Sequence, residues 1–149
     1  MALTISRVGD VTQELVDALG RLVPQLSRTS PAPDAGVVER LVGTTGTVLF
    51  IARDGEDGPI VGTLTLVTFQ IPTGVRAWIE DVIMDESARG QGGGEALTRA
   101  ALDAAAGLGA RTVELTSRPS RVPANRLYQR IGFVARETNV YRYTVSAAP

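Results

Sequence analysis

The sequence contains no cysteine, no histidine and no lysine, and all 15 of its basic residues are arginine. Without cysteine the chain has no disulfide bond, no thiolate metal site and no cysteine nucleophile. Without histidine it lacks the usual general base and the commonest metal ligand. Without lysine it cannot form the lysine-containing phosphate loop of nucleotide hydrolases. Any acid–base chemistry must therefore come from carboxylates, tyrosine, arginine or water, and we expect no metal.

The charge of the chain is nearly balanced. Its 149 residues carry a formal net charge of −1, which argues against nucleic-acid binding, because such domains usually carry a basic patch. Residues 1–8 contain no basic segment followed by a long apolar one, and no apolar run approaches the roughly 18 residues of a membrane-spanning helix. We therefore expect a soluble, cytoplasmic protein that binds neither nucleic acid nor membrane. With 44% hydrophobic residues, the chain can bury a core.

Local sequence patterns predict a single α+β domain over residues 1–149. Apolar residues recur at alternating or helical spacing between turns rich in Gly, Pro and Asp. The predicted order is β-α-α-β-β-β-α-β-α-β-β. The predicted strands are 3–8, 48–52, 60–69, 77–84, 112–116, 133–135 and 140–145, and the predicted helices are 11–22, 37–42, 95–106 and 123–130. Asp10 and Asp34 are expected to begin the first two helices, and Pro24 to end the first.

The most informative segment is residues 89–94, Arg-Gly-Gln-Gly-Gly-Gly, between a predicted strand and a predicted helix. Glycine is unfavourable inside regular structure, so this cluster indicates a sharp turn or the close approach of another molecule. At a helix start, backbone N–H groups and the helix dipole favour phosphate. The segment also lacks the G-x-G-x-x-G spacing of dinucleotide-binding loops. It fits Arg-x-x-Gly-x-Gly, as Arg89, Gly92 and Gly94; the simple alternative is a glycine-rich surface turn.

A second pattern lies nearer the C-terminus. Leu127, Tyr128, Gly132 and Phe133 match Leu/Phe-Tyr-x-x-x-Gly-Phe. Together with the element order and the glycine segment, this pattern resembles the GNAT family of N-acetyltransferases over nearly the whole chain. The resemblance implies α/β/α layers with a mixed, mostly antiparallel sheet and a splayed central strand pair. It also implies transfer of an acetyl group from acetyl-coenzyme A to a primary amine, of a small molecule or of a peptide or protein N-terminus or lysine.

By resemblance, acetyl-coenzyme A lies where the strand at 77–84 separates from the strand at 112–116. Pantetheine would pair with the backbone near Val82 and Met84, and N–H groups near Ile83 would polarise the thioester carbonyl. The pyrophosphate would accept N–H groups from residues 89–95, where glycine removes Cβ atoms that would keep phosphate oxygens away. The expected cofactor-binding residues are Val82, Ile83, Met84, Arg89, Gly90, Gln91, Gly92, Gly93, Gly94, Glu95, Asn125 and Tyr128.

Tyr128 is the first expected catalytic residue. In the family, the tyrosine at this position protonates the departing thiolate. A phenol with an ordinary pKa of about 10 stays protonated at neutral pH and can do so. The family often has an asparagine where this chain has Arg121, and Asn125 lies on a different face of the predicted helix. Whether Asn125 contacts the cofactor, or Arg121 replaces the asparagine, therefore stays open.

Glu80 is the second expected catalytic residue, as the base that takes a proton from the amine, directly or through water. Strict strand alternation would place Glu80 on one face with Trp78, Val82 and Met84, and Asp81 on the other. Asp81 and water are the alternatives. Because no cysteine can carry an acetyl group, we expect direct attack in a ternary complex.

The acceptor cannot be read from the sequence. The family places it near residues 22–40 and 136–142, which contain side chains of both charges. Asp34, Glu39 and Glu137 could attract a cationic amine, and Arg28, Arg136 and Arg142 could hold a carboxylate. Homodimers are frequent in the family and remain an option here. Two other functions stay open: an acyl-coenzyme A-binding sensor or interaction module without catalysis, and a nucleotide-phosphate-binding protein, which the absence of lysine disfavours.

Overall fold

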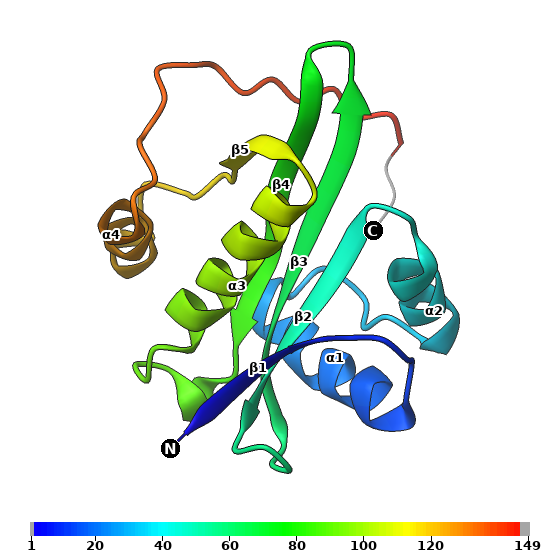
Figure 1. Cartoon of the computed structure of the whole chain (residues 1–149). Helices are drawn as coiled ribbons and strands as arrows, with labels where there is room; N and C mark the ends of the chain where they lie inside the picture. Colours follow the sequence, from blue (N-terminus) through cyan, green and yellow to red (C-terminus); the bar gives the residue numbers. More distant parts are fainter. Residues whose placement is uncertain (1, 147–149) are drawn as a thin grey trace. The chain divides into compact units, whose positions relative to one another are not determined.

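A five-stranded sheet in the order β1-β2-β3-β4-β5 forms the centre of the first unit of the chain (Figure 1). In this computed structural model the described residues are 2–146, and they belong to two compact units, Met1–Leu115 and Thr116–Pro149. The first four strands pair in antiparallel fashion, and β5 runs parallel to β4. Their bounds are β1 Leu3–Arg7, β2 Thr47–Asp54, β3 Ile60–Ile71, β4 Gly74–Met84 and β5 Ala110–Glu114. The predicted fold class, a mixed and mostly antiparallel α+β sheet, is confirmed.

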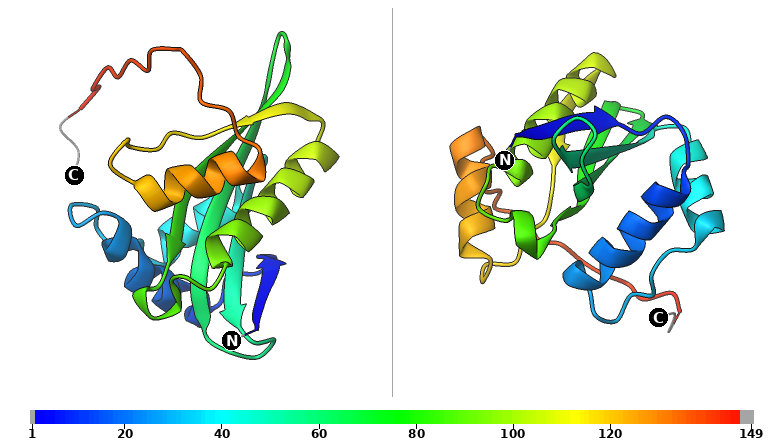
Figure 2. Two further views of the ribbon diagram at one scale, coloured as in Figure 1. Left: turned by 90° about the vertical axis from the view of Figure 1, so that its left-hand side faces the viewer. Right: turned by 90° about the horizontal axis from the view of Figure 1, so that it is seen from below.

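Helices cover both faces of this sheet (Figures 1 and 2). On one face lie α1 (Gln13–Leu26) and α2 (Ala35–Gly43), and on the other lies α3 (Gly93–Gly107). A short 3-10 helix, η1 (Glu86–Ala88), follows β4 in the first unit. The second unit contains α4 (Val122–Ile131). None of the described helices has the length and apolar character that a membrane crossing requires.

The core on the α1/α2 face follows from the helical spacing of apolar residues in the sequence. Leu15, Leu19 and Leu22 of α1 are buried together with Leu49 of β2 and Ile83 of β4. Full burial of such a side chain contributes about 1.5–3 kcal/mol. This packing fixes α1 against the sheet, so that its last turns lie beside the end of β4.

The ends of α1 differ from the prediction, whereas the start of α2 agrees with it. Thr12, not Asp10, begins α1, because its Oγ1 accepts a hydrogen bond from the Leu15 N–H at 3.1 Å. Pro24 does not end the helix, which continues to Leu26. In the last turn its missing N–H costs only one internal hydrogen bond. Asp34 begins α2 as predicted, since its Oδ1 accepts from the Val37 N–H at 2.9 Å.

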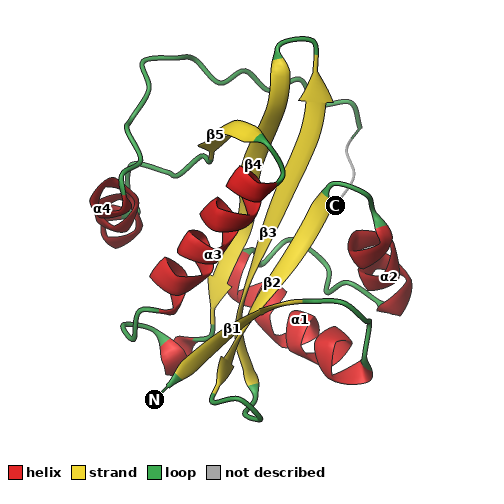
Figure 3. Cartoon of the chain, in the orientation of Figure 1, coloured by secondary structure: helices red, strands yellow, loops and turns green. Residues whose placement is uncertain are grey.

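The two strands predicted at 133–135 and 140–145 are not formed, so the predicted element order is wrong after α4. Figure 3 draws this part of the chain as loop, and the described residues 133–146 contain neither helix nor strand. Val140, Tyr141, Tyr143 and Val145 are between 73% and 91% exposed. Their β-branched and aromatic character fits a pleated, half-buried surface, but a strand also needs a paired neighbour. The sequence pattern cannot supply that neighbour.

Candidate functional site

The glycine segment forms the turn that leads from β4 and η1 into α3. Gly90 and Gly92 have φ of 78° and 83°, in the left-handed region that glycine adopts without strain. The helix begins at Gly93, two residues before the predicted start, and Gly92 caps it without a side-chain hydrogen bond. The N–H groups of Gly93, Gly94 and Glu95 therefore belong to the first turn, where helix geometry provides no intrahelical acceptor.

Two glycines of this turn differ in their surroundings. A Cβ on Gly92 would meet nothing within 4 Å, so that residue is glycine because of its φ, and the space beside it is open. A Cβ on Gly93 would instead meet the Met84 Sδ at 2.7 Å. The start of α3 therefore packs closely on the flexible Met84 side chain at the end of β4, and the turn stays open on the side of Gly92.

Arg89 braces this turn. Its Nε donates a hydrogen bond to the Met84 carbonyl oxygen at 3.2 Å, which ties the turn back to the last residue of β4. The positive charge of Arg89 consequently lies at the turn that begins α3. A positive side chain and helix N–H groups together favour a bound anion.

The end of β4 has a strand partner on one side only. On the β5 side the last pair is Trp78 with Glu114, whereas β4 continues to Met84. On the β3 side pairing reaches Gly62 with Met84. The backbone groups of β4 after Trp78 therefore face no strand among the described residues of the first unit on the β5 side. Such groups require partners when they are buried, and an extended ligand with amides can provide them.

A β-bulge in β4 changes which residues share a face with Glu80. Glu80 pairs with Thr65 and Ile83 pairs with Thr63, so two residues of β4, one of them Asp81, stand opposite one residue of β3. Asp81 has a φ of 49°, an uncommon value for a residue other than glycine.

Because of the bulge, Glu80 shares the α1/α2 face with Ile83, which is buried in the core on that face. Met84 lies on the opposite face, against the start of α3. The prediction that Glu80 shares a face with Val82 and Met84 is wrong, because strict alternation ends at the bulge. The part of that prediction that concerns Trp78 holds, because no bulge separates it from Glu80.

The pKa of the Glu80 carboxyl group is raised above its ordinary value. The side chain is exposed overall, but partial burial of its carboxyl raises the pKa, and the adjacent Asp81 carboxylate raises the pKa further. Burial disfavours the charged form of a carboxyl group, and a second negative charge does the same. Glu80 therefore holds a proton more readily than an ordinary glutamate.

Tyr128 lies in α4 of the second unit, and Gly132 and Phe133 follow directly after the end of this helix. Gly132 has a φ of 126° and donates its N–H to the Tyr128 carbonyl oxygen. The Tyr128 side chain is buried, and its burial raises the pKa, while the positive charge of Arg121 lowers it to a smaller extent. The phenol is consequently protonated at neutral pH and able to donate a proton.

Asn125 and the residues before α4 form a local turn in the second unit. The Asn125 Nδ2 donates to the Arg118 carbonyl oxygen at 3.0 Å, so this side chain stabilises the turn that begins the helix. The hydroxyl of Ser117 is buried and has no hydrogen-bond partner. A buried polar atom without a partner is a group that a ligand can satisfy.

The structure brings together the glycine turn, Arg89 and the end of β4 within the first unit. Tyr128 and Asn125 belong to the second unit. Sequence patterns missed η1 and the side chain of Asp85, which caps it by accepting the Ser87 N–H at 3.0 Å. The spacing of Asp85 and Ser87 was the available signal, because Asp side chains accept backbone N–H groups two residues on. Within residues 2–146, no group of His, Cys, Asp or Glu side chains is arranged to hold a metal ion.

Comparison with known proteins reveals one matching family and several solved structures. The model of the acetyltransferase (GNAT) family matches residues 17–133. No curated protein sequence matches the chain. A transcriptional regulator from Bacillus halodurans C-125 is 27% identical, with a TM-score of 0.75 over 96% of this chain and 100% of that chain.

Two other solved structures are less similar in sequence. An aminoglycoside acetyltransferase from an uncultured soil metagenomic sample is 22% identical, with a TM-score of 0.82 over 97% of this chain and 96% of that chain. Glucosamine-6-phosphate N-acetyltransferase from Arabidopsis thaliana is 19% identical, with a TM-score of 0.77 over 96% and 99% of the two chains. At these identities the likeness concerns the fold alone.

Proposed function

The chain belongs to the GNAT family of acetyltransferases, and from this premise we propose that it is an acetyl-coenzyme A-dependent N-acetyltransferase. The proposed acceptor is a primary amine of a small molecule, a peptide or a protein. The observation that carries the proposal is the open turn at residues 89–94, which lies between the end of β4, where β5 no longer pairs with it, and the start of α3. A surface turn without a ligand function would not need the open space beside Gly92.

The chemical groups of acetyl-coenzyme A match those at the end of β4 and in the turn at residues 89–94. First-turn N–H groups of α3 and the charge of Arg89 suit the pyrophosphate, and an added Cβ at Gly90 or Gly92 would enter open space. The β5-facing backbone of β4 near Val82 suits the pantetheine amides. Bound there, the thioester supplies an activated acetyl group. Backbone N–H groups near Ile83 would then stabilise negative charge on its carbonyl oxygen.

Two side chains are proposed to move protons. Glu80, or water held by it, takes a proton from the amine, and its raised pKa brings it closer to the operating pH. Asp81 remains the alternative base. Tyr128 donates its proton to the departing thiolate. Because the pKa of Tyr128 is raised, the phenol is protonated at neutral pH before the reaction. With no cysteine in the chain, the amine attacks the thioester directly in a ternary complex.

The test is a screen of amine acceptors with acetyl-coenzyme A. Amino sugars, amino acids, peptide N-termini and lysine-containing peptides cover the proposed classes. Because the protein contains no cysteine, a thiol-specific reagent reports only the coenzyme A that is released. We expect release above the hydrolysis background with at least one class, together with a product heavier by one acetyl group in mass spectrometry.

A coenzyme A-binding module without catalysis is the second candidate. It is retained because, of the three structures described above, the one most similar in sequence is a transcriptional regulator. The match covers 96% of this chain and 100% of that chain. Tight binding of coenzyme A with no release on any amine would support the module. Absence of coenzyme A binding would contradict both functions. A cytoplasmic location and a homodimer remain predictions.

A further inference from the structure

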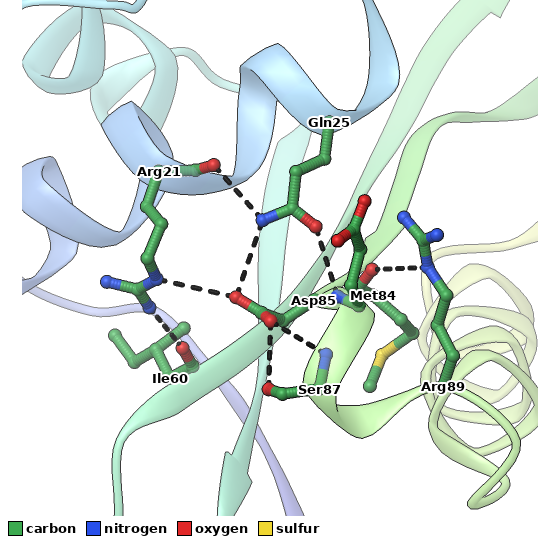
Figure 4. A network of polar contacts seen from close by, with 8 residues as sticks. Arg21, Gln25, Ile60, Met84, Asp85, Ser87 and Arg89 are labelled. Atoms are coloured by element: carbon green, nitrogen blue, oxygen red, sulfur yellow. Dashed lines mark hydrogen bonds and ion pairs between the residues drawn. The ribbon is translucent and has the colours of Figure 1, made fainter.

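A polar network joins the last turns of α1 to the beginning of the turn that leads into α3. Figure 4 shows Arg21 and Gln25 reaching from α1 towards Asp85, which follows directly after β4. These side chains come from distant parts of the sequence, since Gln25 and Asp85 are separated by 60 positions. All of them belong to the first unit of the chain.

Gln25 contacts two consecutive residues of the turn with both ends of its carboxamide. Its Oε1 accepts the Glu86 backbone N–H at 3.1 Å, and its Nε2 donates to the Asp85 Oδ2 at 3.4 Å. The same Nε2 lies 3.3 Å from the Arg21 carbonyl oxygen, one helical turn earlier in α1. A carboxamide is the side chain that can donate and accept in this way without adding charge.

Asp85 connects Gln25 to η1 through its carboxylate group. Its Oδ1 accepts the Ser87 N–H at 3.0 Å and the Ser87 hydroxyl at 2.8 Å. Its backbone N–H donates to the Val61 carbonyl oxygen at 2.8 Å, which fixes the residue to the start of β3. Both carboxylate oxygens are thus engaged, one by α1 and the other by η1.

Arg21 balances the negative charge of Asp85. Its Nε lies 3.5 Å from the Asp85 Oδ2, and its Nη2 donates to the Ile60 carbonyl oxygen at 2.6 Å. An unbalanced carboxylate beside a phosphate-binding turn would repel the ligand. The pairing therefore allows an acidic residue to stand immediately before such a turn.

The turn needs these contacts because it has little stability of its own. Its helix η1 has three residues, and the segment 89–94 contains four glycines, which lose more conformational freedom on ordering than other residues do. A loop that is already ordered when the ligand arrives binds it more tightly, because less entropy is lost on binding. Arg89 restrains the far end of the segment 85–89, whereas Gln25 restrains its near end.

We propose that Gln25 and Asp85 are positioning residues that hold residues 85–89 in the conformation required for donor binding, so that α1 is coupled to the affinity for coenzyme A. This inference rests on the proposed function, since it takes coenzyme A as the ligand of the turn. In this role both residues act through the turn and not through contact with the donor. Their effect is on the order of the turn and on donor affinity.

The experiment compares Gln25→Met with Gln13→Met. Methionine keeps the length of the side chain and removes its hydrogen bonds with Asp85 and Glu86, together with the one to the Arg21 carbonyl oxygen. Gln13 is the matched control, because it lies on the same helix and, within residues 2–146, its Nε2 donates only to Asp17, four residues along α1, at 2.8 Å. Loss of the two Gln25 contacts with the turn is expected to raise the Kd of coenzyme A roughly three- to tenfold, and Gln13→Met is expected to leave it unchanged.

Three further readouts distinguish positioning from a general structural role. Amide hydrogen exchange in peptides covering residues 85–92 should become faster in Gln25→Met and not in Gln13→Met. The KM for acetyl-coenzyme A should rise with the Kd, while kcat at saturating donor changes less than about twofold. Asp85→Asn, which retains an oxygen for the Ser87 N–H, should weaken binding less than Asp85→Ala.

The possible outcomes separate this inference from the proposed function. If the unaltered protein does not bind coenzyme A, the proposed function fails. If it binds coenzyme A and Gln25→Met binds it equally well, with unchanged exchange at residues 85–92, the positioning role is wrong. A fall in kcat and melting temperature with no change in Kd or KM would also overturn it, because it would indicate a structural role only.

Discussion

The Phe133 N–H donates a hydrogen bond to the Tyr128 carbonyl oxygen at 2.9 Å, and the two rings meet edge to face with their centroids 5.7 Å apart. Both contacts depend on Gly132, which turns the chain back at the end of α4. The pattern Tyr-x-x-x-Gly-Phe is therefore a helix end that holds the tyrosine ring from its own C-terminal side. The same residues that mark the family in the sequence fix the orientation of the proposed acid.

Tyr128→Phe should lower kcat with little change in stability. The substitution removes the proposed proton donor and keeps the ring that packs on Phe133. General acid catalysis contributes about 10²- to 10⁴-fold, and we expect a loss within this range when the thiolate is a poor leaving group. Steady-state kinetics with acetyl-coenzyme A measure the loss. Tyr141→Phe, at a side chain that is 88% exposed, is the matched control, and equal rates in the two variants would exclude Tyr128 as the acid.

Gly132→Ala should destabilise the protein. The φ of 126° at this position is unfavourable for any residue with a Cβ, and residues held in such regions cost about 1–3 kcal/mol. Gly107→Ala, at a helical glycine without a positive φ and with nothing within 4 Å of an added Cβ, should be neutral or stabilising. Urea unfolding of both variants gives the comparison. A Gly132→Ala variant as stable as Gly107→Ala would contradict the conformation described for the helix end.

Gly92→Ala should weaken coenzyme A binding. The space beside Gly92 is open, so the methyl group itself fits, but the φ of 83° becomes strained. Relief of that strain would turn the first N–H groups of α3 away from their present direction. Gly92→Asn should be milder, because asparagine tolerates the left-handed region better than alanine. Calorimetric titration with coenzyme A tests the order, and Gly107→Ala again serves as the control.

Glu80→Gln should remove the acidic limb of the pH–rate profile. The raised pKa of Glu80 means that kcat/KM of the unaltered protein rises with pH at values above about 4.3, where an ordinary glutamate is already ionised. The variant should be slow at all pH values, without that limb. Glu56→Gln, in the exposed turn between β2 and β3, should keep the complete profile. An unchanged profile in Glu80→Gln would leave Asp81 or water as the base.

Glu80→Gln should lower activity but should not lower stability at neutral pH. Because the pKa of Glu80 is raised on folding, the folded state favours the protonated form, and stability decreases as pH rises through the folded pKa. Glutamine does not ionise. At neutral pH, Glu80→Gln should therefore melt at the same temperature as the unaltered protein or higher, and the difference should vanish in acid.

Asp85→Asn should destabilise the protein at neutral pH but not in strong acid. Hydrogen bonds from the Ser87 backbone and hydroxyl lower the pKa of Asp85, and Gln25 and Arg21 lower it further. A depressed pKa contributes stability above the ordinary value of about 3.9, and this contribution is lost as pH falls through the folded pKa. Melting temperatures from pH 7 downwards should converge for the two proteins. Asp103→Asn, at an exposed residue of α3, should show no such convergence.

Features that depend on neighbouring residues could be predicted from the sequence. The helical spacing of leucines predicted α1, Asp34 predicted the start of α2, and the glycine cluster predicted a turn before α3. The Gly-Phe pair likewise marked the end of α4. In each case the determining interactions, a cap or a φ angle, lie within one helical turn of the residue.

Features that depend on distant partners could not be predicted in this way. The residues that share a face with Glu80 are set by a bulge, and a bulge exists only relative to the register of β3. The strands predicted after α4 required a paired edge, which a pattern of alternating residues does not provide. The contact of Gln25 with Asp85 joins positions 60 apart, and neither residue belongs to a local pattern that indicates the other.

The sequence by itself therefore determined the helices, the glycine turn, the closed end of α4 and the family. The helices, the turn and the helix end follow from backbone conformations and from apolar spacing, which act over a few residues, whereas the family was indicated by the resemblance of two motifs. Only the tertiary structure decided which face of β4 carries Glu80, where the β4–β5 pairing ends, and that α1 holds the turn leading into α3. Strand register and side-chain contacts between elements arise when separate segments pack against one another, and no local pattern encodes them.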